Sequence, residues 1–182
     1  NPQIVLGLLV SKGGYPLAYD IFEGNKFEGQ TMLPVVDSFK NKYKLEKLLI
    51  VADSGLLSSQ NIEELQTKGY EFILGARIKN ESKFYKEKIL SLALKNGESK
   101  IIIKDNLKLI ITYSDSRAKK DKHNRERGLA KLEKHIKSGK LTKTNINNRG
   151  YNKYLKLDGE ISVTIDKEKF ETDSKWDGLK GY

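Results

Sequence analysis

The apolar run Leu48–Val51 constrains the fold most, because it ends almost directly on an acidic residue in "KLLIVADSGLLSS". An unbroken apolar block of this length predicts a strand of a parallel sheet that is covered on both faces. Asp53 follows at its carboxyl end, which is where ligands bind in open α/β sheets. A carboxylate beside an apolar sheet costs free energy unless a hydrogen bond, a cation or a metal ion compensates it.

Asp53 has a simpler interpretation as the cap of the following helix. Ser58 and Ser59 stand closer to the next helical pattern and can supply the capping oxygen instead. Turns also favour Asp and Gly, so loop stabilisation and ligand binding remain equally supported on spacing alone.

The segments around this strand predict a mixed α/β core in residues 1–77. Residues 4–11 and 15–22 are typical of two antiparallel strands joined by the "KGG" turn. Next comes a helix with Pro34 in its first turn, then the strand ending at Asp53, a second helix from Ser59 to Lys68, and a strand in "YEFILGARI". The periodic apolar residues of the two helices are Met32, Val36, Phe39, Tyr43, Ile62 and Leu65.

Residues 78–174 show a different pattern of two hairpins and two helices. A helix is expected over 82–97, and a second over 115–139. The hairpins turn at Asp105-Asn106 and at Asp158-Gly159. This region is expected to be inserted into the α/β core or appended to it, and residues 175–182 are expected to return toward the core.

The net charge favours a polyanionic partner, with nucleic acid the first candidate. The chain has 34 Lys and Arg against 24 Asp and Glu, a formal net charge of +10, and a pI near 9.5. The helix over 115–139 is the most basic segment, and only its second half has an apolar stripe. Its first half is expected to project into solvent or to lie on a partner, and a solvated helix laced with ion pairs is an equal alternative.

Several other classes of site find no support in the residues. The chain has no cysteine, which suits a reducing cytoplasm, and no apolar run long enough to cross a bilayer, so a soluble protein is expected. His123 and His135 lack partners at metal-ligand spacing, and Gly13-Gly14 precede a strand rather than the helix of a phosphate loop. Because a strand pattern begins at the third residue, we expect a fragment of a longer protein.

The segments "PLAYDIFEGN", "VADSGLLS" and "GYEFILGARIK" resemble, in order and separation, the catalytic core of DDE-type transposases of bacterial insertion sequences. The resemblance covers nearly the first 80 residues. It implies an RNase H-like core whose first strand is missing here, with residues 78–174 as a strand-rich α+β insertion. The implied activity is cleavage and joining of phosphodiester bonds at transposon ends.

In that family an Asp, a second Asp and a Glu hold two Mg²⁺ or Mn²⁺ ions, and hard oxygen ligands suit both metals. The "ADSGLLS" aspartate is the second of the three, so the resemblance makes Asp53 a catalytic metal ligand. The first Asp and the Glu are expected outside this chain, which would leave the fragment alone inactive. The resemblance assigns no metal role to Asp20, Glu23 or Asp177.

The resemblance also favours DNA, as transposon ends and target, as the partner of the basic helix. It further implies a homodimer when active, no membrane, and a bacterial cytoplasmic, nucleoid-associated location. The alternatives are another RNase H-like nuclease or resolvase, and a non-catalytic nucleic-acid-binding module. The candidate DNA-binding residues are Arg117, Lys119, Lys120, Lys122, Arg125 and Arg127.

The missing first strand would leave a gap between the strand that begins "IVLGLLV" and the strand ending at Asp53. Unpaired apolar strand edges tend to pair with another chain. We therefore expect an upstream peptide, a partner chain or the C-terminal "GLKGY" segment to fill the gap.

Overall fold

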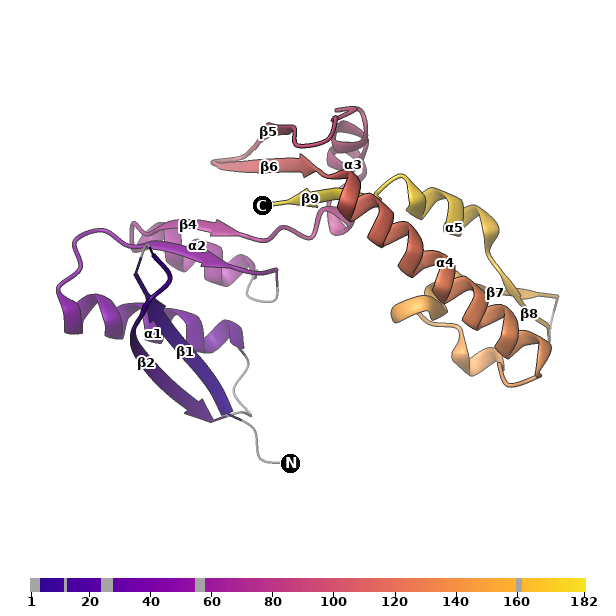
Figure 1. Ribbon diagram of the computed structural model, residues 1–182, viewed down its shortest axis with the longest axis horizontal. Helices are drawn as coiled ribbons and strands as arrows, with labels where there is room; N and C mark the ends of the chain where they lie inside the picture. Colours follow the sequence, from indigo (N-terminus) through magenta and orange to yellow (C-terminus); the bar gives the residue numbers. More distant parts are fainter. Residues whose placement is uncertain (1–3, 12, 24–27, 55–57, 160–161) are drawn as a thin grey trace. The chain divides into compact units, whose positions relative to one another are not determined.

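The protein divides into two compact units, residues 1–77 with Tyr182, and Ile78–Gly181. The computed structural model describes residues 4–11, 13–23, 28–54, 58–159 and 162–182. Within those ranges the fold is mixed α/β, with five α-helices and nine strands that form four small sheets (Figure 1).

The first unit begins with the expected antiparallel hairpin. Its turn bends through Gly14, whose φ of +83° is a conformation that favours glycine. Lys12 of the predicted turn lies outside the described residues. In this unit the elements are β1 (Ile4–Val10), β2 (Pro16–Glu23), α1 (Glu28–Tyr43), β3 (Leu49–Ala52), α2 (Ser59–Thr67) and β4 (Glu71–Leu74).

Strands β3 and β4 run parallel and are connected through α2, as the alternation of strand and helix predicted. Their pairing aligns Leu49 with Glu71 and Ala52 with Leu74. Alternate residues of both strands pack against α1 and α2, because successive strand side chains point to opposite faces. The buried core of this unit comprises Leu33, Val36, Ile50, Leu65 and Leu74.

Two expectations for this unit are wrong. The sheet is not covered on both faces: Ile50 is buried, but Leu49 and Val51 are 53% and 70% exposed. The apolar run therefore has one buried face only. Pro34 lies inside α1 rather than in its first turn, because the helix begins at Glu28.

The hairpin and the β3–β4 pair form separate two-stranded sheets, with no ladder between them in the described ranges. In the described ranges the C-terminal strand β9 (Leu179–Gly181) forms no ladder with either of these sheets and pairs instead with β6 (Leu107–Tyr113) of the second unit. That alternative for the gap is therefore wrong. An upstream peptide or a partner chain stays a prediction.

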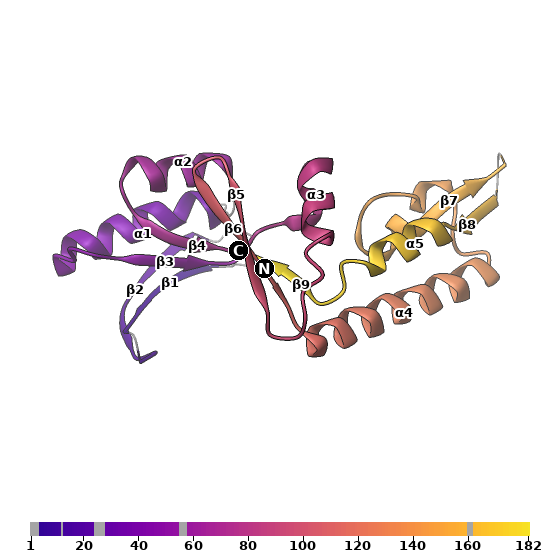
Figure 2. The ribbon, with the colours of Figure 1, turned by 90° about the horizontal axis from the view of Figure 1, so that it is seen from above.

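The second unit contains both predicted hairpins, β5–β6 and β7–β8, and both predicted helices (Figure 2). Asp105, with a φ of +53°, forms the first turn as expected. The buried residues Leu132, Tyr154 and Leu155 form one core cluster of this unit. The elements are α3 (Lys83–Leu90), β5 (Ser99–Lys104), β6 (Leu107–Tyr113), α4 (Asp115–Lys137), β7 (Leu155–Asp158), β8 (Ser162–Ile165), α5 (Lys167–Ser174) and β9.

The second unit differs from expectation in two helices. Helix α3 ends at Leu90, well before Gly97. Helix α5 was not predicted; it is capped by Asp166, whose side chain accepts a hydrogen bond from the Lys169 backbone N–H. None of the helices in the described ranges is both long enough and apolar enough to cross a membrane.

Candidate functional site

Asp53 lies at the carboxyl edge of the β3–β4 pair, as the sequence predicted. Strand β3 ends at Ala52, and the Gly75 backbone N–H donates to the Ala52 carbonyl oxygen at 2.9 Å. This bond belongs to the last pair of the ladder, Ala52 with Leu74, and a Cβ on Gly75 would lie 3.5 Å from the Asp53 Cα, so Asp53 lies beside Gly75. The Asp53 side chain is exposed.

The helix that follows Asp53 has its own cap. The Ser58 side chain accepts a hydrogen bond from the Asn61 backbone N–H at 3.1 Å, and α2 begins at Ser59. Capping of α2 is therefore not the role of Asp53. Residues 55–57 of the "ADSGLLS" motif lie outside the described ranges.

A polar cluster fixes α1 against the chain that enters β4. The Asp37 carboxylate accepts hydrogen bonds from the Tyr70 hydroxyl, at 2.7 Å, and from the Lys68 ammonium group. Burial and this hydrogen bond to Asp37 raise the pKa of Tyr70 to about 12. The pKa of Asp37 is lowered, because the bonds from Lys68 and Tyr70 outweigh the opposing effect of burial. The cluster thus stabilises the packing of α1 against the β3–β4 pair, which carries Asp53 at its edge.

Among the described residues, Asp53 is the candidate metal ligand that the sequence predicted. The Asp53 carboxylate is a hard oxygen donor at an exposed sheet edge, which fits one ligand of Mg²⁺. No group of three or more His, Cys, Asp or Glu side chains that could hold a metal ion occurs in the described ranges. Asp177, to which the family resemblance assigns no metal role, forms an ion pair with Arg125.

Most side chains in the first half of α4 are exposed, as expected, and two ion pairs run along it, but Arg125 faces inward. Arg125 was a candidate DNA contact, but it is only 9% exposed. Its guanidinium group lies 5.1 Å from the Phe170 ring centre and donates to both carboxylate oxygens of Asp177. Arg125 therefore stabilises the second unit rather than presenting its charge at the surface.

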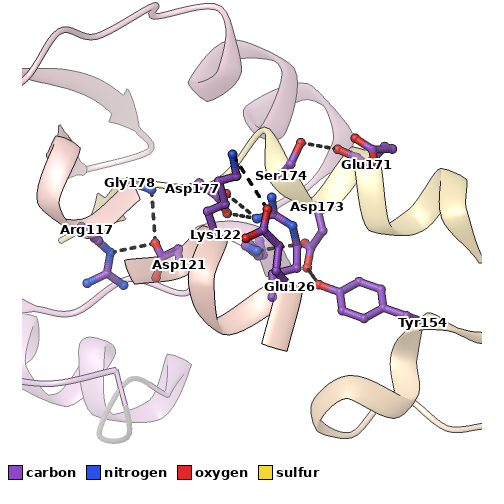
Figure 3. A network of polar contacts seen from close by, with 12 residues as sticks. Arg117, Asp121, Lys122, Glu126, Tyr154, Glu171, Asp173, Ser174, Asp177 and Gly178 are labelled. Atoms are coloured by element: carbon purple, nitrogen blue, oxygen red, sulfur yellow. Dashed lines mark hydrogen bonds and ion pairs between the residues drawn. The ribbon is translucent and has the colours of Figure 1, made fainter. Parts of the chain in front are cut away.

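The same face of α4 holds the turn before β9. Asp121 accepts a hydrogen bond from the Gly178 backbone N–H at 3.2 Å, and Arg117 lies 3.5 Å from the Asp121 carboxylate (Figure 3). Gly178 has a φ of +83°, and a Cβ there would lie 2.5 Å from the Tyr113 ring. These contacts explain why charged residues occupy an inward face of α4.

The outward face of α4 carries a row of cations. Lys120, Arg127, Lys131 and Lys134 are exposed, and their spacing places them on one side of the helix. They lie opposite the buried Arg125 and Leu132. Lys119 borders this row. Arg117 and Lys122 are exposed as well, but each has an acidic neighbour one turn along, Asp121 at 3.5 Å and Glu126 at 3.8 Å.

Sequence reasoning did not find the polar centre around Asp173. Its carboxylate accepts hydrogen bonds from Lys79 at 2.9 Å and from Lys153 and Tyr154. Burial opposes ionisation of Asp173, but these three donors outweigh it and hold the pKa well below its ordinary value. Burial and the bond to Asp173 raise the pKa of Tyr154. The partners lie far apart in sequence and have no common motif, so no sequence signal joins them.

This centre borders a cavity of about 340 Å³ in the second unit. The cavity is lined by residues of both charges and by aromatic rings. They include Lys79, Arg117, Arg125, Tyr151, Lys153, Asp173 and Trp176.

Comparison with known families identifies the class of protein. A family model described as "Transposase DDE domain" matches residues 3–174. The chain therefore belongs to the transposase DDE domain family, in agreement with the resemblance of its motifs. No curated protein and no solved structure matches the chain.

Proposed function

We propose that this chain is part of a DNA transposase, with an RNase H-like core, that cleaves and joins phosphodiester bonds at transposon ends. Asp53 is the second of three metal-binding carboxylates, and the other two come from outside these residues. The observation that supports this role is the exposed Asp53 at the carboxyl edge of a parallel strand pair in a DDE-family chain.

Two Mg²⁺ or Mn²⁺ ions, when bound, would supply stabilisation of the attacking and leaving oxygens of an in-line displacement. The contribution of this chain is to hold one carboxylate at a fixed place. The pairing of β3 with β4 sets the Asp53 backbone, and Ser58 rather than Asp53 caps α2. The 182 residues alone, with one of the three carboxylates, have no strand-cleavage activity.

The decisive experiment replaces Asp53 by Asn in the complete transposase. We expect strand cleavage with Mg²⁺ to fall below detection while affinity for transposon-end DNA stays within about twofold, because the change removes a metal-binding charge and little volume. Asp105→Asn is the matched control, since it removes a carboxylate from an exposed turn of the second unit. Retained cleavage in Asp53→Asn would overturn the assignment.

The products of the reaction separate transposition from the nearest alternative. A transposase joins a 3′-hydroxyl to new DNA, whereas an RNase H-like nuclease uses only water. Joined products in the wild type therefore support the proposal, and hydrolysis alone favours a nuclease. The active form is proposed to be a homodimer in the bacterial cytoplasm, associated with the nucleoid.

We propose that α4 contacts the DNA backbone. The supporting observation is the outward row Lys120, Arg127, Lys131 and Lys134, which spans about 21 Å along the helix. Lys119 extends this surface, while Arg117 and Lys122 contribute less because each is near a carboxylate. Arg125 is excluded, because it is buried against Asp177.

This interface is tested by removing three charges from the row, as Lys120→Gln, Arg127→Gln and Lys131→Gln together. Each lost phosphate contact should reduce the slope of log affinity against log salt concentration by about 0.9. The control removes three lysines from α3, as Lys83→Gln, Lys86→Gln and Lys88→Gln. Equal slopes in the two variants would contradict the interface. Salt-dependent binding without any metal-dependent activity in the complete protein would instead support a non-catalytic binding module.

A further inference from the structure

Gly75 lies beside Asp53, immediately after the last paired residues of β3 and β4. Its N–H donates to the Ala52 carbonyl oxygen at 2.9 Å, and Gly75 itself is buried. The register ends with the pair Ala52 and Leu74, and Asp53 and Gly75 are the residues that directly follow this pair. The backbone that carries the Asp53 carboxylate is therefore in direct contact with Gly75.

The space at Gly75 is too small for any side chain. A Cβ there would lie 2.8 Å from the Ser54 backbone nitrogen, 3.2 Å from the Asp53 carbonyl carbon and 3.5 Å from the Asp53 Cα. All three are backbone atoms, so rotation of a side chain cannot relieve the clash. The φ of Gly75 lies outside the left-handed region, and the constraint is therefore space rather than backbone conformation.

We infer that Gly75 is a positioning residue for Asp53, because its missing side chain lets the end of β4 approach the Asp53–Ser54 backbone. The inference rests on the proposed metal-binding role of Asp53. A side chain at residue 75 pushes this backbone away from β4 and displaces the carboxylate with it. Active-site geometry tolerates such displacement poorly, since about 1 Å of misplacement can cost about a hundredfold in rate.

The chain offers a matched pair of substitutions. Gly75→Ala introduces the backbone clash. Gly13→Ala adds the same methyl group in the same unit, but its Cβ would lie 3.5 Å from the nearest atom, an ordinary contact with the Tyr15 ring. Leu74→Val is a second control, because it removes a methylene group from the core of β4 without filling the space at Gly75.

The first test measures metal binding in the 182-residue chain by nuclear magnetic resonance. Titrated Mn²⁺ should broaden the backbone amide signals of Asp53 and Ser54 in the wild type, in Gly13→Ala and in Leu74→Val. We expect Gly75→Ala to need at least about threefold more Mn²⁺ for the same broadening. Intact β3–β4 amide signals in Gly75→Ala establish that the strands still pair. Loss of that pairing would overturn the inference, because Gly75 would then be required for folding of the strand pair and not specifically for the position of Asp53.

The second test measures strand cleavage in the complete transposase. Gly75→Ala should lower kcat about tenfold or more and leave KM for DNA unchanged, because DNA binding does not depend on Asp53. Equal kcat in Gly75→Ala and Gly13→Ala would overturn the inference. The proposed function fails in a different way, through an Asp53→Asn variant that still cleaves DNA and still shows broadening by Mn²⁺.

Discussion

The two units of the molecule differ in where they place charge and where they place apolar surface. Residues 78–181 hold 26 of the 34 Lys and Arg and 15 of the 24 Asp and Glu, a formal charge of +11 against −1 for residues 1–77. The first unit instead exposes apolar strand residues, with Ile4, Tyr19 and Val51 each between 67% and 70% exposed. This contrast supports the proposed division of tasks, with metal binding at Asp53 in the first unit and DNA contact at α4 in the second.

Charged residues also contribute differently to the stability of the two units. In the second unit, Arg125, Asp173 and Asp177 are largely buried and paired. In the first unit, the described core is aliphatic and aromatic, and the polar cluster of Asp37, Lys68 and Tyr70 lies nearer the surface. Removal of a charge should therefore destabilise the second unit far more where the charge faces inward than where it faces outward.

The largest expected effect comes from Arg125→Met. This change leaves the Asp177 carboxylate buried without its partner and should lower the free energy of unfolding of the second unit by about 3 kcal/mol. Trp176 is the single tryptophan of the chain and is buried in this unit, so its fluorescence during urea unfolding reports on the second unit alone.

Arg127→Met is the matched control for this prediction. Arg127 lies two residues along the same helix but is exposed, and its replacement should change the free energy of unfolding by less than about 0.5 kcal/mol. Adding Asp177→Leu to Arg125→Met should recover part of the loss, because the uncompensated buried charge is then removed. Similar losses for Arg125→Met and Arg127→Met would remove the distinction between the two faces of α4.

Whether the sequence predicted a feature depends on how far apart along the chain the interacting residues lie. The two hairpins of the second unit, the capping of α2 by one of Ser58 and Ser59, and the place of Asp53 depend on neighbouring residues, and the sequence predicted each of them. Local patterns carry this information because turn chemistry and capping act over a few residues.

The features that sequence did not predict depend on distant partners. Arg125 belongs to a basic segment, and only the contact with Asp177, 52 residues later, makes it an inward residue. The crowding of Gly75 against Asp53 likewise requires the register of β3 and β4. The exposed face of β3 was missed because an apolar run does not show whether one or both of its faces are covered.

A smaller effect is expected for Asp173→Asn, which should lower the free energy of unfolding by about 2 kcal/mol at pH 7. The reason is that Lys79, Lys153 and Tyr154 lose a charged hydrogen-bond acceptor. The pKa of Asp173 is lowered in the folded state, below an unfolded value near 4. Its contribution is therefore fully present above about pH 4, and it is lost as the pH falls through the lower folded value.

Urea unfolding of the wild type and of Asp173→Asn between pH 7 and pH 3, followed through Trp176, tests this linkage. The difference in the free energy of unfolding should be constant from pH 7 to about pH 5 and should shrink below about pH 4. Asp105→Asn, which changes an exposed turn residue, should show a small difference at every pH. A difference for Asp173→Asn that does not depend on pH would refute the role of its ionised form.

The smallest effect on stability is expected on the exposed face of the hairpin. Leu8 and Tyr19 face each other across β1 and β2 and are 53% and 67% exposed. Leu8→Lys should therefore change the free energy of unfolding, measured by circular dichroism in urea, by less than about 0.5 kcal/mol. Large exposed apolar patches promote association, so the same change should reduce concentration-dependent self-association in sedimentation velocity.

Leu65→Ala, at a fully buried position of the same unit, is the contrasting variant and should lower the free energy of unfolding by about 3 kcal/mol. If Leu8→Lys destabilised the unit as much as Leu65→Ala, the hairpin face would have to be part of a core, and the contrast between a partly uncovered first unit and an internally paired second unit would not hold.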